Sequence, residues 1–169
     1  GSEYGQAYSR RIVRPGGEMM SMDGKQTILI VDDSRLICEQ IKAALKEENI
    51  TICEAHSGLE AQEQLRQCQP DLILLDVVLP DADGYELYNT LQDMDRKNAV
   101  IIFLTSKSSD EDVVKGFSMG ACDYIKKPFV KKELQSRIHA HLIQKQQRDE
   151  LDRQNRELRN NMEKLNYMA

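Results

Sequence analysis

Short apolar runs alternate with helical patterns through the middle of this 169-residue chain. Runs rich in Ile, Leu and Val predict five strands, at residues 27–32, 50–54, 71–75, 99–104 and 122–125. Between them apolar residues recur every three or four positions, which predicts helices that begin near Ser34, Ser57, Gly84 and Ser109. Strict alternation of strand and helix is typical of an α/β fold, a doubly wound parallel sheet with helices on both faces.

The pattern predicts that the last helix is much longer than the others. From about Val130 to Met168 the chain has no Pro and no Gly, and about 38 helical residues would span about 57 Å. Its first apolar residues are spaced by four, as for packing on a globular core: Leu134, Ile138 and Leu142. A spacing of 4-3-4-3 then predicts a left-handed coiled coil, with a seam of Leu151, Asn155, Leu158, Met162 and Leu165. The alternative is a solvated amphipathic helix that packs on its own domain.

These patterns divide the chain into three parts. Residues 1–24 contain Pro15-Gly16-Gly17, which argues against regular structure, and no apolar core of a signal peptide, so we interpret them as a tag or flexible leader. Residues 25–143 form the predicted domain. Residues 144–169 are the predicted coiled-coil linker helix, continuous with the fifth helix of that domain.

Composition narrows the function classes. The net charge is −5 and no segment is strongly basic, which argues against a nucleic-acid partner. No apolar run approaches the roughly 20 residues of a membrane helix. The four cysteines form no Cys-x-x-Cys, and we expect buried or half-buried thiols in a reducing cytoplasm.

Polar groups follow the predicted strands at the same end. Asp32 and Asp33 close one run, Asp76 and Thr105 close two others, and Lys127 follows the last. The carboxyl ends of parallel strands form the ligand site of an open α/β sheet. Three acids repel one another unless a cation lies among them, and Mg²⁺ suits carboxylates that also share it with a phosphate. The residues therefore predict transfer of a phosphoryl group onto Asp76, with a hydroxyl and an ammonium to bind it.

Each of these residues has a plainer explanation. Asp33 could cap the following helix, a role compatible with metal binding. Thr105 could be an ordinary β-branched strand residue, and Tyr124 could be half-buried core. Lys126 is the alternative ammonium, although the residue that precedes Pro128 is the better candidate.

Residues 25–143 resemble the receiver domain of two-component response regulators. The motifs that carry the resemblance are VDD at 31–33, LLDVVLPDADG at 74–84, LTS at 104–106 and YIKKPF at 124–129. The resemblance implies a flavodoxin-like (βα)5 fold with strand order 2-1-3-4-5. It also implies that Asp76 is phosphorylated by a phosphohistidine of a sensor histidine kinase or phosphotransfer protein.

The same resemblance implies a metal site. Mg²⁺ would be held by Asp33, Asp76 and a backbone carbonyl near Val78, with Asp32 reaching it through water. The receiver fold used only as a binding scaffold is the competing possibility, but such scaffolds usually lack one of these acids or the lysine.

A switch is implied as well. Thr105 would move to the phosphoryl group, Tyr124 would rotate inward, and Lys127 would form an ion pair with the phosphoryl group. Val78 and Lys107 would flank the path of the attacking water, and they leave the lifetime of the acyl phosphate open.

The tail, which ends in LRNNMEKLNYMA, is similar to the helix that leads into diguanylate cyclase (GGDEF) domains. No GGDEF residues are present, so the chain itself is expected to catalyse only its own phosphotransfer and dephosphorylation. We expect a cytoplasmic homodimer, paired through a receiver face and the coiled coil. A phosphatase output, a kinase output or no output are the alternatives. A flavin protein and a DNA-binding regulator are disfavoured.

Overall fold

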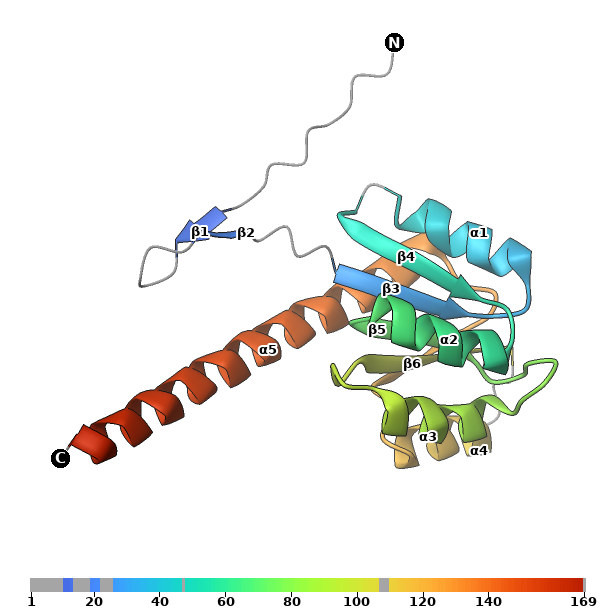
Figure 1. Cartoon of the computed structure of the whole chain (residues 1–169). Helices are drawn as coiled ribbons and strands as arrows, with labels where there is room; N and C mark the ends of the chain where they lie inside the picture. The colour runs from blue at the N-terminus through green and yellow to red at the C-terminus, as the bar shows by residue number, and fades with distance from the viewer. Residues whose placement is uncertain (1–10, 14–18, 22–25, 47, 107–109, 169) are drawn as a thin grey trace, which may run out of the picture.

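The computed structural model describes residues 11–13, 19–21, 26–46, 48–106 and 110–168. Five parallel strands form one sheet: β3 (Gln26–Val31), β4 (Ile50–Ala55), β5 (Leu72–Asp76), β6 (Val100–Thr105) and β7 (Asp123–Lys126). Their order is β4-β3-β5-β6-β7, which is 2-1-3-4-5 when these five are counted along the chain (Figure 1). The predicted fold is confirmed, and each strand begins and ends within one residue of its predicted bounds.

Five helices connect or follow the strands: α1 (Arg35–Ala44), α2 (Gly58–Cys68), α3 (Gly84–Met94), α4 (Asp110–Ser118) and α5 (Lys131–Met168). Ser34 and Ser57 cap α1 and α2, where their side chains accept backbone N–H bonds, as predicted. The cap of α3 is Asp83, directly before Gly84. Ser109, the expected start of α4, lies outside the described residues. None of the helices in the described part of the chain combines the length and apolar character that a membrane span requires.

The sheet is buried on both faces, which explains its nearly continuous apolar strands. In β3, Ile28 and Ile30 face a cluster formed with α1 and α5. The intervening Leu29 and Val31 face a second cluster formed with α2 and α3. All four side chains are fully buried. The two clusters hold the carboxyl ends of the strands in register.

The first turns of α5 are anchored to the domain. Leu134, Ile138 and Leu142 are buried in the same cluster as α1, as their spacing predicts. Each such side chain stabilises the fold by about 1.5–3 kcal/mol. The attachment continues past residue 143, because Lys145 is 2% exposed and donates to the backbone oxygen of Lys97 at 2.8 Å. Arg148 donates to the backbone oxygen of Asn98 at 3.2 Å.

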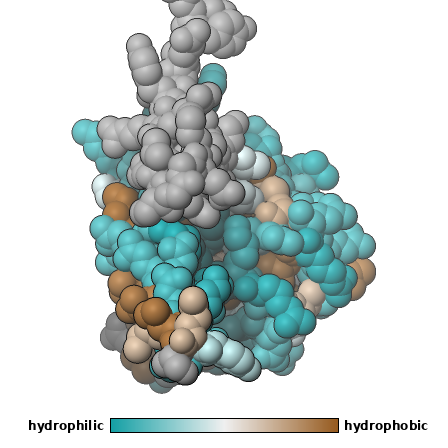
Figure 2. Space-filling model, turned by 60° about the vertical axis from the view of Figure 1, so that its left-hand side comes forward, coloured by the Kyte–Doolittle hydropathy of each residue, from teal (hydrophilic) through white to brown (hydrophobic). Residues whose placement is uncertain are grey.

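Beyond Arg148, α5 extends away from the sheet as a rod (Figure 1). The residues of the predicted seam are all exposed: Leu151, Asn155, Leu158, Met162 and Leu165. The face of the molecule in Figure 2 is mainly hydrophilic, with hydrophobic residues in small groups. The exposed apolar side chains on this part of α5 are compatible with a coiled coil, which stays a prediction.

Two expectations are corrected. The leader contains regular structure, because β1 (Arg11–Val13) pairs antiparallel with β2 (Met19–Ser21). Strands of three residues carry too few positions for a sequence pattern to reveal them. Cys122 is exposed rather than buried or half-buried, since β7 begins one residue later than predicted.

Candidate functional site

Three carboxylates meet at the carboxyl ends of β3 and β5. Oxygens of Asp32, Asp33 and Asp76 all lie within 4.8 Å of one another. Asp32 is fully buried, and its Oδ1 accepts the backbone N–H of Ser34 at 2.9 Å. Asp33 is exposed, and the cap of α1 is Ser34. The alternative in which Asp33 caps the helix is therefore wrong, and its carboxylate lies with the other two.

Lys127 completes the cluster from the end of β7. Its Nζ donates to Asp32 Oδ2 at 2.5 Å and to Asp76 Oδ2 at 3.3 Å. Its backbone N–H donates to the oxygen of Thr105 at 2.8 Å, and a cis peptide bond joins it to Pro128. Burial alone would lower the pKa of Lys127, but Asp32 and Asp76 raise it above the ordinary value. The side chain therefore carries a full positive charge at neutral pH.

Asp76 has the environment of a reactive carboxylate. Burial and the nearby charge of Asp32 raise its pKa, and Lys127 together with the backbone N–H of Val78 opposes the rise. That N–H donates to Oδ1 at 3.2 Å. The backbone of Asp76 is covered by the start of α3, because a Cβ at Gly84 would lie 2.2 Å from the Asp76 carbonyl oxygen. Only glycine allows this close approach.

The loop that follows Asp76 is held in place. Val78 and Asp83 form an isolated antiparallel bridge. The two hydrogen bonds of this bridge use the carbonyls of Val77 and Ala82, and not that of Val78. Asp81 accepts the N–H of Gly58 at the start of α2 at 2.7 Å, and this bond lowers its pKa. The loop is thus tied to two helices while its Val78 side chain stays exposed.

Thr105 is the last residue of β6, and Tyr124 lies within the neighbouring strand β7. Thr105 is 1% exposed. The ring of Tyr124 packs on Phe103, with centroids 6.1 Å apart, and covers α4 so closely that a Cβ at Gly116 would lie 3.2 Å from it. Lys126 is exposed, whereas Lys127 bonds to two carboxylates of the cluster. Lys127 is therefore the ammonium of the site. Lys107 lies outside the described residues.

Tyr85 was not among the functional residues predicted from the sequence. Its hydroxyl lies 3.3 Å from that of Tyr124 and donates to the backbone oxygen of Asp112 at 3.2 Å. Burial, followed by the contact with Tyr124, raises the pKa of Tyr85. Helical spacing assigned this residue to the core. The feature of the sequence that could have indicated a functional role is that Tyr85 carries a hydroxyl and directly follows Gly84.

The site therefore combines three carboxylates and one ammonium at the carboxyl edge of the sheet, where all but Asp33 are buried or half-buried. Oxygen donors of this kind suit a divalent hard cation, and the ammonium suits a phosphoryl oxygen. A matching family model, the response regulator receiver domain, covers residues 28–139. The chain belongs to the response regulator receiver family.

Relatives support this assignment. The chain is 43% identical over 117 residues to the transcriptional regulatory protein YvrH of Bacillus subtilis, covering 69% of this chain and 48% of YvrH. It is 42% identical over 139 residues to a probable cyclic di-GMP phosphodiesterase of Vibrio cholerae, covering 80% of this chain and 31% of that protein. The chain therefore spans half or less of the length of these two relatives.

Solved structures show the same receiver fold. A CheY-like response regulator receiver domain from Methanospirillum hungatei aligns with a TM-score of 0.68 at 29% identity, over 74% of this chain and 99% of that one. The BeF3-activated DrrB receiver domain aligns with a TM-score of 0.61 at 32% identity, over 70% of this chain and 97% of that one.

Proposed function

We propose that this receiver accepts a phosphoryl group on Asp76 from a phosphohistidine of a sensor kinase or phosphotransfer protein. The observation that carries the proposal is the meeting of Asp32, Asp33, Asp76 and Lys127 at one edge of the sheet. A carboxylate oxygen of Asp76 would attack phosphorus, the P–N bond would break, and the histidine ring would keep its electron pair. The product is an acyl phosphate.

The carboxylates of Asp32, Asp33 and Asp76 and the carbonyl of Val78 would hold Mg²⁺. The donor set fits, since all are oxygens and the three carboxylates already lie within 4.8 Å of one another. When bound, the ion would supply positive charge that offsets the repulsion between the carboxylates and the incoming phosphate.

Lys127 would act after transfer. In the described state its ammonium is shared between Asp32 and Asp76. Phosphorylation removes one carboxylate charge and places phosphoryl oxygens within reach, so we expect Lys127 to pair with them. Thr105 is expected to donate its hydroxyl to the same group. Tyr124 would then rotate inward, which makes it the reporter of the phosphorylated state.

The proposal is tested with acetyl phosphate and Mg²⁺. We expect one added phosphate in the wild type and none in Asp76→Asn, because an amide is not a nucleophile for phosphorus. Removal of divalent cations with EDTA should suppress labelling. Intact mass measured under mild conditions reports both results. Asp81→Asn is the matched control, since Asp81 lies in the same loop outside the cluster, and it should be labelled like the wild type. Full labelling of Asp76→Asn would refute the assignment.

For transmission of the signal, we propose a homodimer that pairs through a receiver face and through the seam of α5. The exposed apolar row from Leu151 to Leu165 supports a second copy of the chain as its partner. Asn155 at an a-type position suits a two-stranded register.

For the output, we propose an enzyme of cyclic di-GMP metabolism, absent from this sequence. The similarity of the tail to the lead-in of diguanylate cyclases supports a cyclase. The Vibrio cholerae relative instead favours a phosphodiesterase, and its alignment covers 80% of the chain, compared with 69–70% for the DNA-binding relative MtrA of Mycolicibacterium paratuberculosis and for YvrH. The alignment with the Vibrio cholerae relative, over 139 residues, is longer than the receiver at residues 25–143. It must therefore include residues of the leader or of the stalk. Synthesis or hydrolysis of cyclic di-GMP by the intact protein distinguishes the two.

A further inference from the structure

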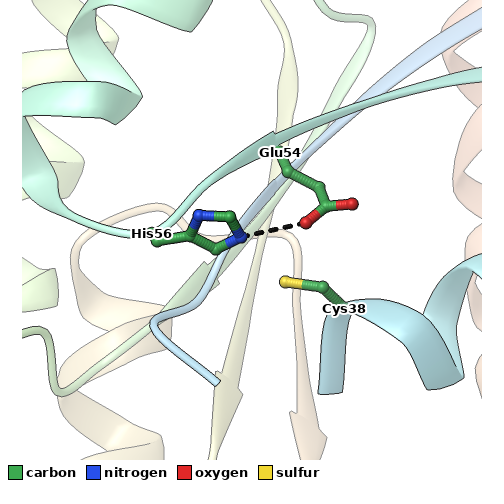
Figure 3. A group of neighbouring side chains, drawn as sticks. All are labelled: Cys38, Glu54 and His56. Atoms are coloured by element: carbon green, nitrogen blue, oxygen red, sulfur yellow. Dashed lines mark hydrogen bonds and ion pairs between the residues drawn. The ribbon is translucent and has the colours of Figure 1, made fainter. Parts of the chain in front are cut away.

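A second group of metal-ligand side chains lies on the edge of the sheet between β4 and α1. The Sγ of Cys38, a carboxylate oxygen of Glu54 and a ring nitrogen of His56 all lie within 4.8 Å of one another (Figure 3). Ile52 and Glu54 are two residues apart on β4, so their side chains lie on the same face of the strand. Ile52 packs in the cluster that contains Cys38 of α1, and this face is therefore the one covered by α1. His56 directly follows the strand. In the described residues, only this group and the phosphorylation cluster bring three or more His, Cys, Asp or Glu side chains so close.

The ligand atoms are oriented by other contacts. Glu54 Oε1 forms an ion pair with Lys42, while Oε2 lies 2.9 Å from His56 Nε2. On the other side of the ring, His56 Nδ1 lies 3.6 Å from a carboxylate oxygen of Glu60. A histidine that ligates a metal through one nitrogen commonly faces a carboxylate with the other. The arrangement therefore supplies three ligand atoms, with Lys42 paired to Glu54 and Glu60 lying beside the free side of the His56 ring.

We propose that Cys38, Glu54 and His56 bind a divalent transition-metal ion of the zinc type, with a fourth position open to water. Thiolate, imidazole and carboxylate are the ligands that Zn²⁺ takes, whereas Mg²⁺ and Ca²⁺ take oxygen alone. Bond lengths of about 2.0–2.3 Å place tetrahedral ligand atoms about 3.3–3.8 Å apart. The three atoms lie within 4.8 Å, so small side-chain rotations complete the site.

Access and charge are compatible with an ion. Cys38 is buried, but the side chains of Glu54 and His56 are 19% and 25% exposed, which leaves a path from solvent. Metal binding requires the thiolate form of Cys38, so the thiol proton is released when the ion binds. The thiolate and Glu54 then carry two negative charges beside a divalent ion, and Lys42 keeps its pairing with Glu54 Oε1.

Ordinary ion pairing does not account for the group. His139 and His141 each pair with one carboxylate, Glu48 at 2.8 Å and Asp123 at 3.0 Å. Only His56, among the histidines, also has a cysteine thiol within 4.8 Å of a ring nitrogen. His139 thus provides a matched control for His56. Cys122, which is exposed and lies outside the group, provides one for Cys38.

The test is titration of the full chain with Co²⁺ as a spectroscopic probe, followed by Zn²⁺. We expect one Co²⁺ per chain with a thiolate-to-cobalt charge-transfer band, displaced by one equivalent of Zn²⁺. Cys122→Ser and His139→Gln should keep the band. Cys38→Ser should lose it, and His56→Gln should weaken Co²⁺ affinity by about tenfold or more. Co²⁺ bound at the all-oxygen phosphorylation cluster would give no such band.

Absence of the band in the folded wild type, or its persistence in Cys38→Ser, would overturn the proposal. If circular dichroism shows that Cys38→Ser does not fold, the test uses the Co²⁺ affinity of variants at the two partly exposed ligands, Glu54 and His56. Wild-type affinity in both His56→Gln and Glu54→Gln would then overturn it, and a tenfold loss in either supports it. The two sites share no ligand, although the Cys38 thiol donates to the backbone oxygen of Asp32 at 3.7 Å. Labelling of Asp76 by acetyl phosphate is a separate readout, so failure of the cobalt site and failure of the proposed function remain distinguishable.

Discussion

At the scale of single residues, the chemistry of the site was predictable and its mechanical support was not. Asp32, Asp76 and Lys127 were identified because each follows a strand in a parallel sheet, and such ends converge whatever the details of packing. The contact of Tyr85 with Tyr124 joins α3 to β7 across β6. A local sequence pattern cannot predict this contact, because the hydroxyls of Tyr85 and Tyr124 come from elements that are far apart in the chain.

The first residue-scale prediction concerns this contact. Tyr85→Phe removes the hydroxyl that touches Tyr124 and Asp112 but keeps the ring on Phe103, 5.1 Å between centroids. If Tyr85 holds Tyr124 in the unphosphorylated position, loss of about 1 kcal/mol of hydrogen bonding favours the switched state by about fivefold. We therefore expect faster phosphorylation by acetyl phosphate, measured as the initial rate of labelling.

Tyr88→Phe is the matched control for that rate. Tyr88 also packs on Phe103, at 5.6 Å, but its hydroxyl lies near Gln92 at 3.5 Å. Its labelling rate should equal that of the wild type. Equal rates in the wild type and both variants would show that Tyr85 does not restrain the switch.

At the scale of elements, apolar runs predicted the strands to within one residue because both faces of the sheet are buried. In the central strands β3 and β5, the first acidic residue after the apolar run marks the carboxyl end of the strand, as Asp32 and Asp76 do. The pairing of β1 with β2 was missed, since three-residue strands carry too few positions to show a period. Exposure of Cys122 was missed for the related reason that one residue of shift moves a side chain out of the strand.

The second prediction concerns the attachment of α5 to β7. Asp123 accepts from Arg137 at 2.7 Å and pairs with His141 at 3.0 Å, both on α5. Burial raises the pKa of Asp123, but His141, the N–H of Tyr124 and Arg137 together lower it below the ordinary value. A depressed pKa contributes stability above the unfolded pKa of Asp, about 3.9, and this contribution is lost as pH falls through the folded value.

Asp123→Asn should accordingly reduce the free energy of unfolding at pH 7 by about 1–2 kcal/mol. The deficit should shrink as the pH is lowered below about 4, where the wild-type carboxylate also becomes protonated. Denaturant unfolding at several pH values measures both. Asp93→Asn on the exposed end of α3 serves as the control, since Asp93 is exposed. A deficit that is constant from pH 7 to pH 3 would contradict the assignment to the carboxylate charge.

At the scale of the whole molecule, α5 is both a core helix and a stalk. From the sequence, residues 144–169 were assigned to a linker helix outside the predicted domain. Lys145 and Arg148 instead bind the carbonyls of Lys97 and Asn98, before β6. A lysine can bury its methylene stem and still direct its ammonium to a carbonyl, so polarity alone did not reveal the contact.

The third prediction concerns the seam of the stalk. Replacing Leu158 and Leu165 by Ser should shift the sedimentation of the chain towards monomer, because these exposed leucines would be buried in the seam of the proposed dimer. Short helices are marginal in water, so we expect a weak wild-type dimer that requires high protein concentration. Asn160→Ser with Tyr167→Ser is the control, seven residues apart on the outer face of the same heptads, and it should leave the dimer intact. An unchanged dimer in the leucine variant would exclude this seam as the dimer interface.

The last prediction concerns coupling of phosphorylation to the stalk. Because Lys145 and Arg148 attach the start of the stalk to the loop before β6, the receiver and α5 as far as Arg148 should move as one body. A change in receiver pairing must then alter how two stalks cross beyond that point, which requires two discrete arrangements of the dimer. Spin labels at position 160 of both chains, in a Cys122→Ser background, should give different distances with and without phosphorylation. Spin labels at positions 97 and 148 would disrupt the attachment of α5 to the loop before β6. Amide hydrogen exchange of residues 134–142 is measured instead, and it should be the same with and without phosphorylation if the receiver and the start of α5 move as one body. Identical label distances at full phosphorylation would exclude the mechanism, because a rigid body that neither pairs differently nor bends has no means to carry the signal.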